Sequence, residues 1–338
     1  MRRLLAATIC ACLTLGAPAV VLAAKRSWAD GEIKLVTGQG LMGGDAARFR
    51  PDAPLTRRAL DGLVAELAES PTTAAANPTA QVTLAQLDQA LVRGLELSDE
   101  ARRFYLGARA TGAKPPARFG TEVVARLVGL RKNHAAPNDD LELRPDDVAT
   151  RAEAAYSAAQ ILRFSGWEVE SVERASETFE LPVYRPWQRR VLQTAFNLIG
   201  YPYVWGGTSS TEQTLFGVRS RGGFDCSGFA WRVYKLQSYP GGERLSATLR
   251  GRTAAQMAGE IPKARRIAFA NLEPGDLLFF GRGGRRARPA AVDHMGIYAG
   301  NGWMIHSSRY GVALARVDGW YSERFAWGRR PLAEAALL

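Results

Sequence analysis

One loop-to-helix junction, at residues 223–229 (GFDCSGF), limits the possible folds of this chain more than any other feature. The apolar residues Phe229, Val233 and Leu236 recur at helical spacing, so a helix is expected to begin near Cys226. At a helix start the unpaired N–H groups and the helix dipole favour a thiolate over a thiol. A buried structural cysteine is the alternative, because lone cysteines are commonly buried.

Three short apolar segments downstream of this junction, each bounded by turn residues, predict β-strands. They are residues 274–280 (PGDLLFF), 293–298 (DHMGIY) and 304–307 (MIHS). The sequence GNG at 300–302 predicts a hairpin that brings His294 and His306 near each other across a strand pair. A helix that starts at a cysteine and is followed by short strands predicts an α+β fold, with helices packed against an antiparallel sheet.

The side chains on these segments fit the arrangement that a cysteine nucleophile needs. Cys226 would attack an amide carbonyl as a thiolate, and His294 would hold the proton and deliver it to the leaving amine. His306 would hydrogen-bond His294 and fix its tautomer and ring angle. A zinc site made of the same three residues is the alternative, but no CxxC or HExxH spacing accompanies them, so neither a metal nor a cofactor is expected.

Four motifs, in the same order along the chain, resemble those of the NlpC-type peptidases, papain-like bacterial enzymes that cut peptidoglycan stem peptides. The motifs are YVWGG at 203–207, DCSG at 225–228, PGDL at 274–277 and DHMGIY at 293–298. The resemblance covers about residues 187–330 and implies cleavage between D-γ-glutamate and a diamino acid, although no residue identifies that bond. The alternatives are a wall amidase or acyltransferase with the same cysteine and histidine, and a wall-binding protein with a weak catalytic domain.

The resemblance also implies that Asp225 and Ser227, on either side of the cysteine, line the substrate groove. Asp225 can also cap the helix through its carboxylate, and an anion at this place raises the pKa of the thiol. The backbone N–H of Cys226 and the hydroxyl of Tyr203 are the candidate donors to the oxyanion. Packing within the aromatic segment 201–205 is the other reading of Tyr203.

Two stretches depart from the family pattern. One is polar, at 208–223, and the other is rich in glycine and arginine, at 281–289. The motifs place both stretches next to the nucleophile or the base, where loops often carry function. The basic stretch would then hold an acidic group of the substrate or a wall polymer, and the alternative is a solvated loop.

The first 24 residues have the pattern of a secretory signal peptide, with two arginines before an apolar run. An uncleaved anchor and a lipoprotein acylated at Cys12 are the alternatives. Cleavage would remove Cys10 and Cys12, so Cys226 would be the one thiol of the mature chain, which could form no internal disulfide. The formal net charge of +11 suits acidic wall polymers. The mature chain is expected in the cell envelope or wall, with no membrane span and no nucleic-acid partner.

Residues 25–165 contain an internal repeat. The sequence FRPDAPLTR at 49–57 recurs as LRPDDVATR at 143–151, and VTLAQL at 82–87 is a degraded third copy. In the first two copies a threonine stands where a helical pattern begins and can cap that helix. Such units bury their faces against one another. The repeats resemble S-layer homology modules, which dock on cell-wall polysaccharide, and a helical spacer or regulatory domain without a ligand is the alternative.

The sequence therefore predicts four successive parts. They are a signal peptide at 1–24, an S-layer-homology-like helical region at 25–165, a linker at 166–186 and an NlpC-type cysteine peptidase domain at 187–338. An apolar stripe between Val191 and Ile199 predicts the first helix of the last part. Together these patterns predict an exported, wall-associated cysteine endopeptidase.

Overall fold

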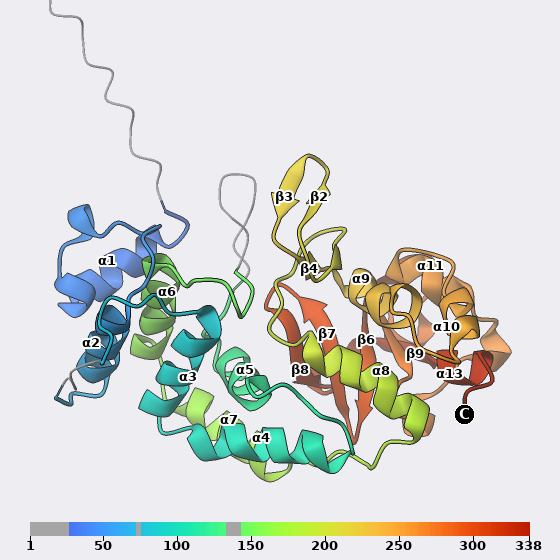
Figure 1. The fold of residues 1–338 in the computed structure, drawn as a ribbon. Coiled ribbons are helices and arrows are strands. Elements are labelled where there is room, and N and C mark those ends of the chain that lie inside the picture. Colours follow the sequence, from blue (N-terminus) through green and yellow to red (C-terminus); the bar gives the residue numbers. More distant parts are fainter. Residues whose placement is uncertain (1–26, 72–75, 133–142) are drawn as a thin grey trace, which may run out of the picture.

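The computed structural model describes residues 27–71, 76–132 and 143–338 (Figure 1). Over these residues the chain forms a helical N-terminal region, followed by a C-terminal region that combines helices with a five-stranded antiparallel sheet. The predicted α+β fold, preceded by a mainly helical region, is therefore confirmed. The predicted signal peptide, with Cys10 and Cys12, lies outside the described residues.

Capping threonines set the starts of several helices in the N-terminal region. The elements described there are α1 (Asp30–Gly38), α2 (Arg57–Leu67), α3 (Leu84–Gly94), α4 (Ser98–Ala110), α5 (Phe119–Leu127), α6 (Arg151–Leu162) and α7 (Trp167–Glu177), with the short turns η1 (Leu41–Gly43) and η2 (Ala46–Arg48). The hydroxyls of Thr56, Thr83 and Thr150 accept hydrogen bonds from backbone N–H groups at the starts of α2, α3 and α6. Each threonine belongs to one copy of the sequence repeat, so all three copies carry the same cap.

The three repeat copies meet in a closed ring of backbone hydrogen bonds. The N–H of Leu55 donates to the carbonyl of Ala149 (2.8 Å), that of Ala149 to Val82 (2.9 Å), and that of Val82 back to Leu55 (3.1 Å). All three side chains are fully buried, and β-bridges join residues next to them. The copies are therefore equivalent in space, and the degraded copy at 82–87 takes a full part in the core.

The N-terminal region also buries a cluster of charged side chains. The guanidinium of Arg131 donates two hydrogen bonds to the carboxylate of Asp88, one of them 3.0 Å long, and lies 3.4 Å from Glu153. Burial raises the pKa of Asp88, and the positive charge of Arg131 opposes that rise. The contact between opposite charges therefore offsets part of the cost of burying each of them.

The C-terminal region is organised around one antiparallel sheet. Its strands are β5 (Leu277–Gly281), β6 (Val292–Gly300), β7 (Trp303–Ser308), β8 (Gly311–Arg316) and β9 (Phe325–Arg329), in the spatial order β8-β7-β6-β5-β9. The helices are α8 (Pro186–Asn197), α9 (Cys226–Trp231), α10 (Glu243–Thr248), α11 (Ala254–Gly259), α12 (Gly319–Arg324) and α13 (Pro331–Glu334), with the turns η4 (Lys263–Arg265) and η5 (Phe269–Asn271). α9 continues as a π-helical turn, η3 (Arg232–Leu236), and packs on β6 and β7. The predicted apolar stripe is buried along α8 and the residues that follow it.

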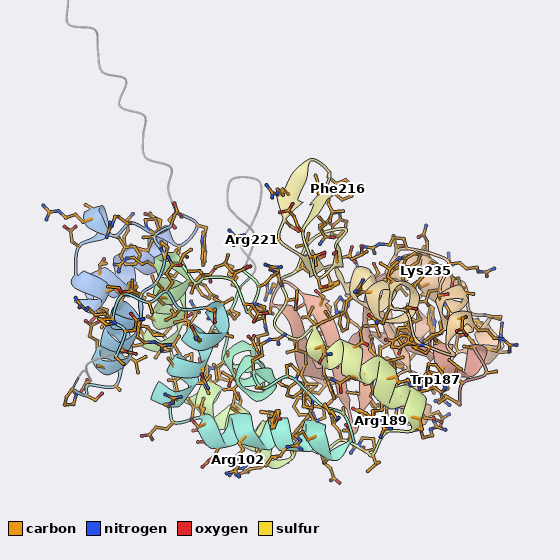
Figure 2. All side chains as sticks on the ribbon, viewed as in Figure 1. Arg102, Trp187, Arg189, Phe216, Arg221 and Lys235 are labelled. Atoms are coloured by element: carbon orange, nitrogen blue, oxygen red, sulfur yellow. The ribbon has the colours of Figure 1, made fainter. Side chains whose placement is uncertain are left out.

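The two stretches that depart from the family pattern form short elements. The polar stretch contains β1 (Thr208–Ser209), paired with β4 (Gly223–Phe224), and β2 (Gln213–Leu215), paired with β3 (Val218–Ser220). Figure 2 shows Phe216 at the tip of the β2–β3 hairpin and Arg221 on the side of the N-terminal region, where the guanidinium lies 3.7 Å from the Asp147 carboxylate. The basic stretch runs through η6 (Gly284–Arg286) to the start of η7 (Pro289–Ala291).

The two regions share one hydrophobic core. The ring of Trp303 on β7 packs edge-on against Phe104 of α4 and against Phe179, with ring centres 6.0 and 5.1 Å apart. Arg126 of α5 donates to two main-chain carbonyls of the C-terminal region. The segment 166–186 connects the two regions and contains α7, which packs against α4. The helical region is therefore fixed against the sheet on the side of β7 and β8 (Figure 1).

Candidate active site

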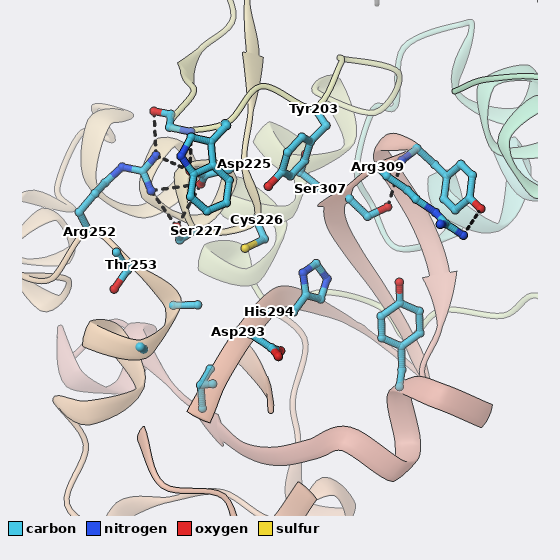
Figure 3. A pocket seen from close by; sticks show the side chains of 18 of the residues that line it. Tyr203, Asp225, Cys226, Ser227, Arg252, Thr253, Asp293, His294, Ser307 and Arg309 are labelled. Atoms are coloured by element: carbon cyan, nitrogen blue, oxygen red, sulfur yellow. Dashed lines mark hydrogen bonds and ion pairs between the residues drawn. The ribbon is translucent and has the colours of Figure 1, made fainter. Parts of the chain in front are cut away.

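Cys226 is the first residue of α9, and its backbone is held by a helix cap. Asp225 is the N-cap residue, and its carboxylate accepts a hydrogen bond of 2.5 Å from the N–H of Gly228. The cap fixes the turn of the chain into the helix. This turn directs the side chain of Cys226 into a cleft, where Figure 3 shows its sulfur facing the ring of His294.

The β6–β7 hairpin brings His294 and His306 together. Its turn consists of Asn301 and Gly302, whose φ angles of 49° and 80° are left-handed, as a tight hairpin turn requires. The Nε2 of His294 lies 2.8 Å from the Nδ1 of His306, within hydrogen-bond distance. This bond leaves the Nδ1 of His294 as the ring nitrogen available to the cysteine.

The surroundings of the histidine pair fix its geometry. A Cβ on Gly296, the glycine of the DHMGIY motif, would lie 3.1 Å from the Cβ of His306, so glycine keeps β6 and β7 close at this point. The ring of Tyr321 contacts both histidines, with ring centres 5.1 Å from His306 and 6.0 Å from His294. The pair is therefore enclosed on more than one side.

Burial disfavours the charged forms of Cys226 and His294. Loss of water, with a smaller contribution from the Asp225 carboxylate, raises the pKa of the Cys226 thiol to about 12. Burial lowers the pKa of His294 to about 4 and that of His306 well below its usual value. Both shifts oppose the thiolate that a helix start favours, because a buried site disfavours charge.

Arg252 is a site residue that the sequence did not reveal. Its guanidinium pairs with both carboxylate oxygens of Asp225, at 3.1 and 3.0 Å, and donates to the hydroxyl of Ser227 at 2.7 Å. The one sequence signal nearby is the capping box of Thr253, which predicts the start of α11 but no partner for Arg252. Arg252 compensates the charge of Asp225 beside Cys226. Asp225 and Ser227 line the cleft, and their contact with a substrate stays a prediction.

Tyr203 is placed beside Cys226 by a parallel β-bridge to Phe224. Its ring lies on the wall of the cleft, and Figure 3 shows the phenol oxygen directed toward Cys226. Burial raises the pKa of Tyr203, so the phenol keeps its proton and can donate it in a hydrogen bond. The role of Tyr203 as an oxyanion donor stays a prediction, as does that of the Cys226 N–H.

The cleft around Cys226 has a volume of about 1320 Å³. Its walls come from residues 203–206, the tip of the β2–β3 hairpin, the start of α11, residues 307–310 and α12. The polar stretch therefore reaches the cleft through Phe216. The basic stretch at 281–289, all of which the structure describes, does not line it.

Two further properties follow from the described part of the chain. Among residues 27–71, 76–132 and 143–338, no group of three or more His, Cys, Asp or Glu side chains has an arrangement that could hold a metal ion. No helix within those ranges is long and apolar enough to cross a membrane.

Comparison with known families identifies two parts of the chain. Residues 200–330 match the NlpC/P60 family, and the match includes Cys226, His294 and His306. This part of the chain is an NlpC/P60 domain. Residues 24–59 match the S-layer homology domain. That match covers the first of the three repeat copies, and the hydrogen-bonded ring relates the other two copies to it.

Several proteins of known name resemble the NlpC/P60 domain. The gamma-D-glutamyl-L-lysine dipeptidyl-peptidase of Bacillus subtilis is 31% identical over 37% of this chain and 33% of its own length. The probable endopeptidase YafL of Escherichia coli is 36% identical over 41% of this chain and 48% of its own length. The murein DD-endopeptidase MepH of Escherichia coli is 38% identical over 34% of each chain. The chain thus spans half or less of the length of these relatives.

Solved structures of the same family are also similar to this domain. An NlpC/P60 family protein from Bacillus cereus is 25% identical, with a TM-score of 0.33 over 45% of this chain and 42% of that protein. RipD of Mycobacterium tuberculosis, described as a non-catalytic NlpC/p60 domain protein, is 22% identical, with a TM-score of 0.32 over 44% of this chain and 98% of RipD.

Proposed function

We propose that this chain is a secreted cysteine endopeptidase that hydrolyses amide bonds in peptidoglycan stem peptides. The observation that carries the proposal is the 2.8 Å contact between His294 and His306, next to Cys226 in one cleft. A nucleophile, a base and a group that orients the base are thereby arranged in the order that a cysteine peptidase needs. The names of the similar endopeptidases support the same activity.

In the proposed reaction the resting pair is neutral. When the substrate carbonyl approaches Cys226, the thiol proton passes to the Nδ1 of His294 and the sulfur bonds to the carbonyl carbon. The Nδ1 of His306 holds the imidazole of His294 at its Nε2 atom. The Tyr203 hydroxyl and the Cys226 N–H donate to the oxyanion. His294 then returns the proton to the leaving amine. A water molecule, deprotonated by the same ring, hydrolyses the thioester and regenerates the thiol.

The proposed scissile bond joins D-γ-glutamate to the diamino acid of the stem peptide. The name of the Bacillus subtilis relative, a gamma-D-glutamyl-L-lysine dipeptidyl-peptidase, supports this bond. The name of MepH, a murein DD-endopeptidase, describes another bond, so the assay has to identify the bond as well as the activity.

The decisive experiment is mass analysis of purified peptidoglycan after digestion by the full chain. The expected products end at D-γ-glutamate, and the Cys226→Ala variant, checked for folding by thermal denaturation, should release none of them. Fragments cut between the glycan and the first alanine would show an amidase instead. A folded wild type that releases no fragment from walls of either diamino-acid type would contradict the proposal.

We also propose that the helical region attaches the enzyme to cell-wall polysaccharide and so keeps it in the cell envelope. The S-layer homology match at 24–59 and the three equivalent repeat copies support this. Attachment raises the local concentration of an insoluble substrate without changing the chemistry. Sedimentation of the full-length Cys226→Ala variant with purified walls tests the idea. Binding should survive moderate salt, whereas binding through net charge alone would fade, and no binding at low salt would contradict it.

A further inference from the structure

Exposed aromatic side chains gather on the rim of the cleft. Six aromatic side chains are exposed in the described residues, and four of them line this one cleft. The four are Trp205 (73% exposed), Phe216 (82%), Trp320 (54%) and Tyr310 (39%). They come from four separate segments of the chain, so local sequence does not explain why they converge. Large exposed apolar groups that share one concave surface usually mark a binding site.

Phe216 is the least expected member of this rim. It occupies the turn of the β2–β3 hairpin with a φ angle of 52°, a left-handed conformation that costs energy for a bulky residue. Its ring lies against Gly206, where a Cβ would approach within 2.9 Å. Glycine or asparagine would adopt this conformation more easily. The aromatic ring is therefore present despite the strain that it imposes on the backbone of the turn. Figure 2 shows this residue at the outermost point of the hairpin.

The hairpin that carries Phe216 is firmly attached to the domain. The side chain of Gln213 accepts a hydrogen bond from the N–H of Thr208 (3.1 Å) and donates one to the carbonyl of Gly223 (2.9 Å). These bonds tie the hairpin to the strand that leads directly into Cys226. The ring is therefore presented at a fixed position relative to the nucleophile.

Arginines lie over two other rings of the rim. The guanidinium of Arg324 is 4.6 Å from the centre of Trp320, and that of Arg309 is 4.8 Å from the centre of Tyr310. Such pairs present an apolar ring face next to several N–H donors. A ligand that suits them has apolar faces edged with oxygen atoms that accept hydrogen bonds.

The pyranose rings of a polysaccharide have this character, because their C–H faces are apolar and their edges carry hydroxyl and acetamide groups. The stem peptide has mostly small or charged side chains, which make little apolar contact with exposed aromatic rings. In peptidoglycan the glycan strand is joined to the stem peptide, so a stem in the cleft brings sugar rings to its edge. This step depends on the proposed function.

We propose that Trp205, Phe216 and Trp320 form a glycan subsite, so the enzyme prefers stem peptides that remain attached to sugar. The subsite is supplied in part by the β2–β3 hairpin, which departs from the family motif pattern. It selects the polymer over the free peptide, while Cys226 and His294 carry out the same reaction on both.

The preference can be measured with two soluble probes that share one stem peptide, one free and the other linked to an N-acetylglucosaminyl–N-acetylmuramoyl disaccharide. The wild type should show the higher kcat/KM on the disaccharide probe, chiefly through a lower KM. Each of Trp205→Ala, Phe216→Ala and Trp320→Ala should reduce this preference about fivefold. Trp167→Ala, which removes an equally exposed ring from α7 (62%), is the matched control and should leave it unchanged. Equal kcat/KM for both probes in the wild type would overturn the inference.

A binding measurement separates this inference from the proposed function. Glycan oligomers freed of peptide should quench the tryptophan fluorescence of full-length Cys226→Ala, and the quenching should weaken in the double variants with Trp205→Ala or Trp320→Ala. If the glycan oligomers bind to Cys226→Ala but the wild type cleaves neither probe, the subsite is retained and the peptidase activity is rejected. No quenching, or quenching that persists at full strength in both double variants, would reject the subsite whatever the activity.

Discussion

The two regions of this molecule bury ionisable side chains in opposite ways. In the helical region, Arg131 and Asp88 are buried as opposite charges in direct contact. In the NlpC/P60 domain, His294 and His306 are buried side by side, and burial lowers the pKa of both. In the first arrangement each charge offsets part of the cost of burying the other, whereas the second leaves two imidazoles whose charged forms are disfavoured. Substitutions should therefore affect stability in one region and activity in the other.

The largest effect is expected from removal of the thiol. Cys226→Ala should lower kcat/KM on a soluble stem peptide by at least about 10³-fold, because no other group supplies a nucleophile to His294. The temperature of unfolding should change little, since the helix cap of Asp225 remains. Enzyme kinetics measure the loss of kcat/KM, and calorimetry measures the temperature of unfolding. A variant with wild-type activity would rule out the mechanism.

The helical region should show the reverse pattern. Arg131→Leu leaves Asp88 buried without its partner and should lower the free energy of unfolding by about 3–5 kcal/mol. Arg174→Leu is the matched control, because its pair with Glu170 is exposed and should be worth less than about 0.5 kcal/mol. Urea denaturation measures both variants. The comparison between the two regions fails if the two losses of stability are equal.

The two histidines should differ from each other. His294→Ala should be nearly as inactive as Cys226→Ala. His306→Gln should keep about 1–10% of the activity, because an amide can still hydrogen-bond the imidazole and hold its orientation. His306→Ala, which cannot, is the control and should fall below His306→Gln. If His306→Gln were inactive while His294→Ala remained active, the two roles would be reversed.

The smallest expected effect is a loss of folding stability at acidic pH. Since burial lowers the pKa of His294 to about 4, the unfolded chain binds more protons than the native one below the ordinary value of about 6.5. Stability should therefore be unaffected by this group above pH 6.5 and should fall as the pH drops from 6.5 toward 4. Chemical denaturation between pH 4.5 and 7.5 measures the slope, and His294→Ala should reduce it. An equal slope in that variant would assign the acid sensitivity to other groups.

The site could be predicted from sequence where short-range signals determine it. The turn at 300–302 and the helix start at Cys226 depend on neighbouring residues. The turn was enough to predict that His294 and His306 lie close together, as the structure shows. Arg252 could not be found in this way, because it meets Asp225 only when α11 is packed beside the start of α9. The burial that raises the pKa of the Cys226 thiol could not be predicted either, since desolvation depends on the whole fold and not on the local helix.

The helical region shows the same limit. The two clear repeat copies and their capping threonines were predicted from residues 49–57 and 143–151, but only the hydrogen-bonded ring shows that the third copy is equivalent to them. The segment 166–186 was predicted as a linker from its position, whereas it contains a helix packed on α4. Packing between distant segments leaves no periodic signal in a single sequence.

The ring of hydrogen bonds through Leu55, Val82 and Ala149 also governs the order in which the chain can fold. Two of its three bonds involve Ala149, which comes from the copy at 143–151, so the copies at 49–57 and 82–87 cannot close the ring before that copy is present. Closing the ring joins residues far apart in sequence, which is slow compared with forming the individual helices. We therefore expect the three copies to become stable together, and only after residue 149 has been synthesised.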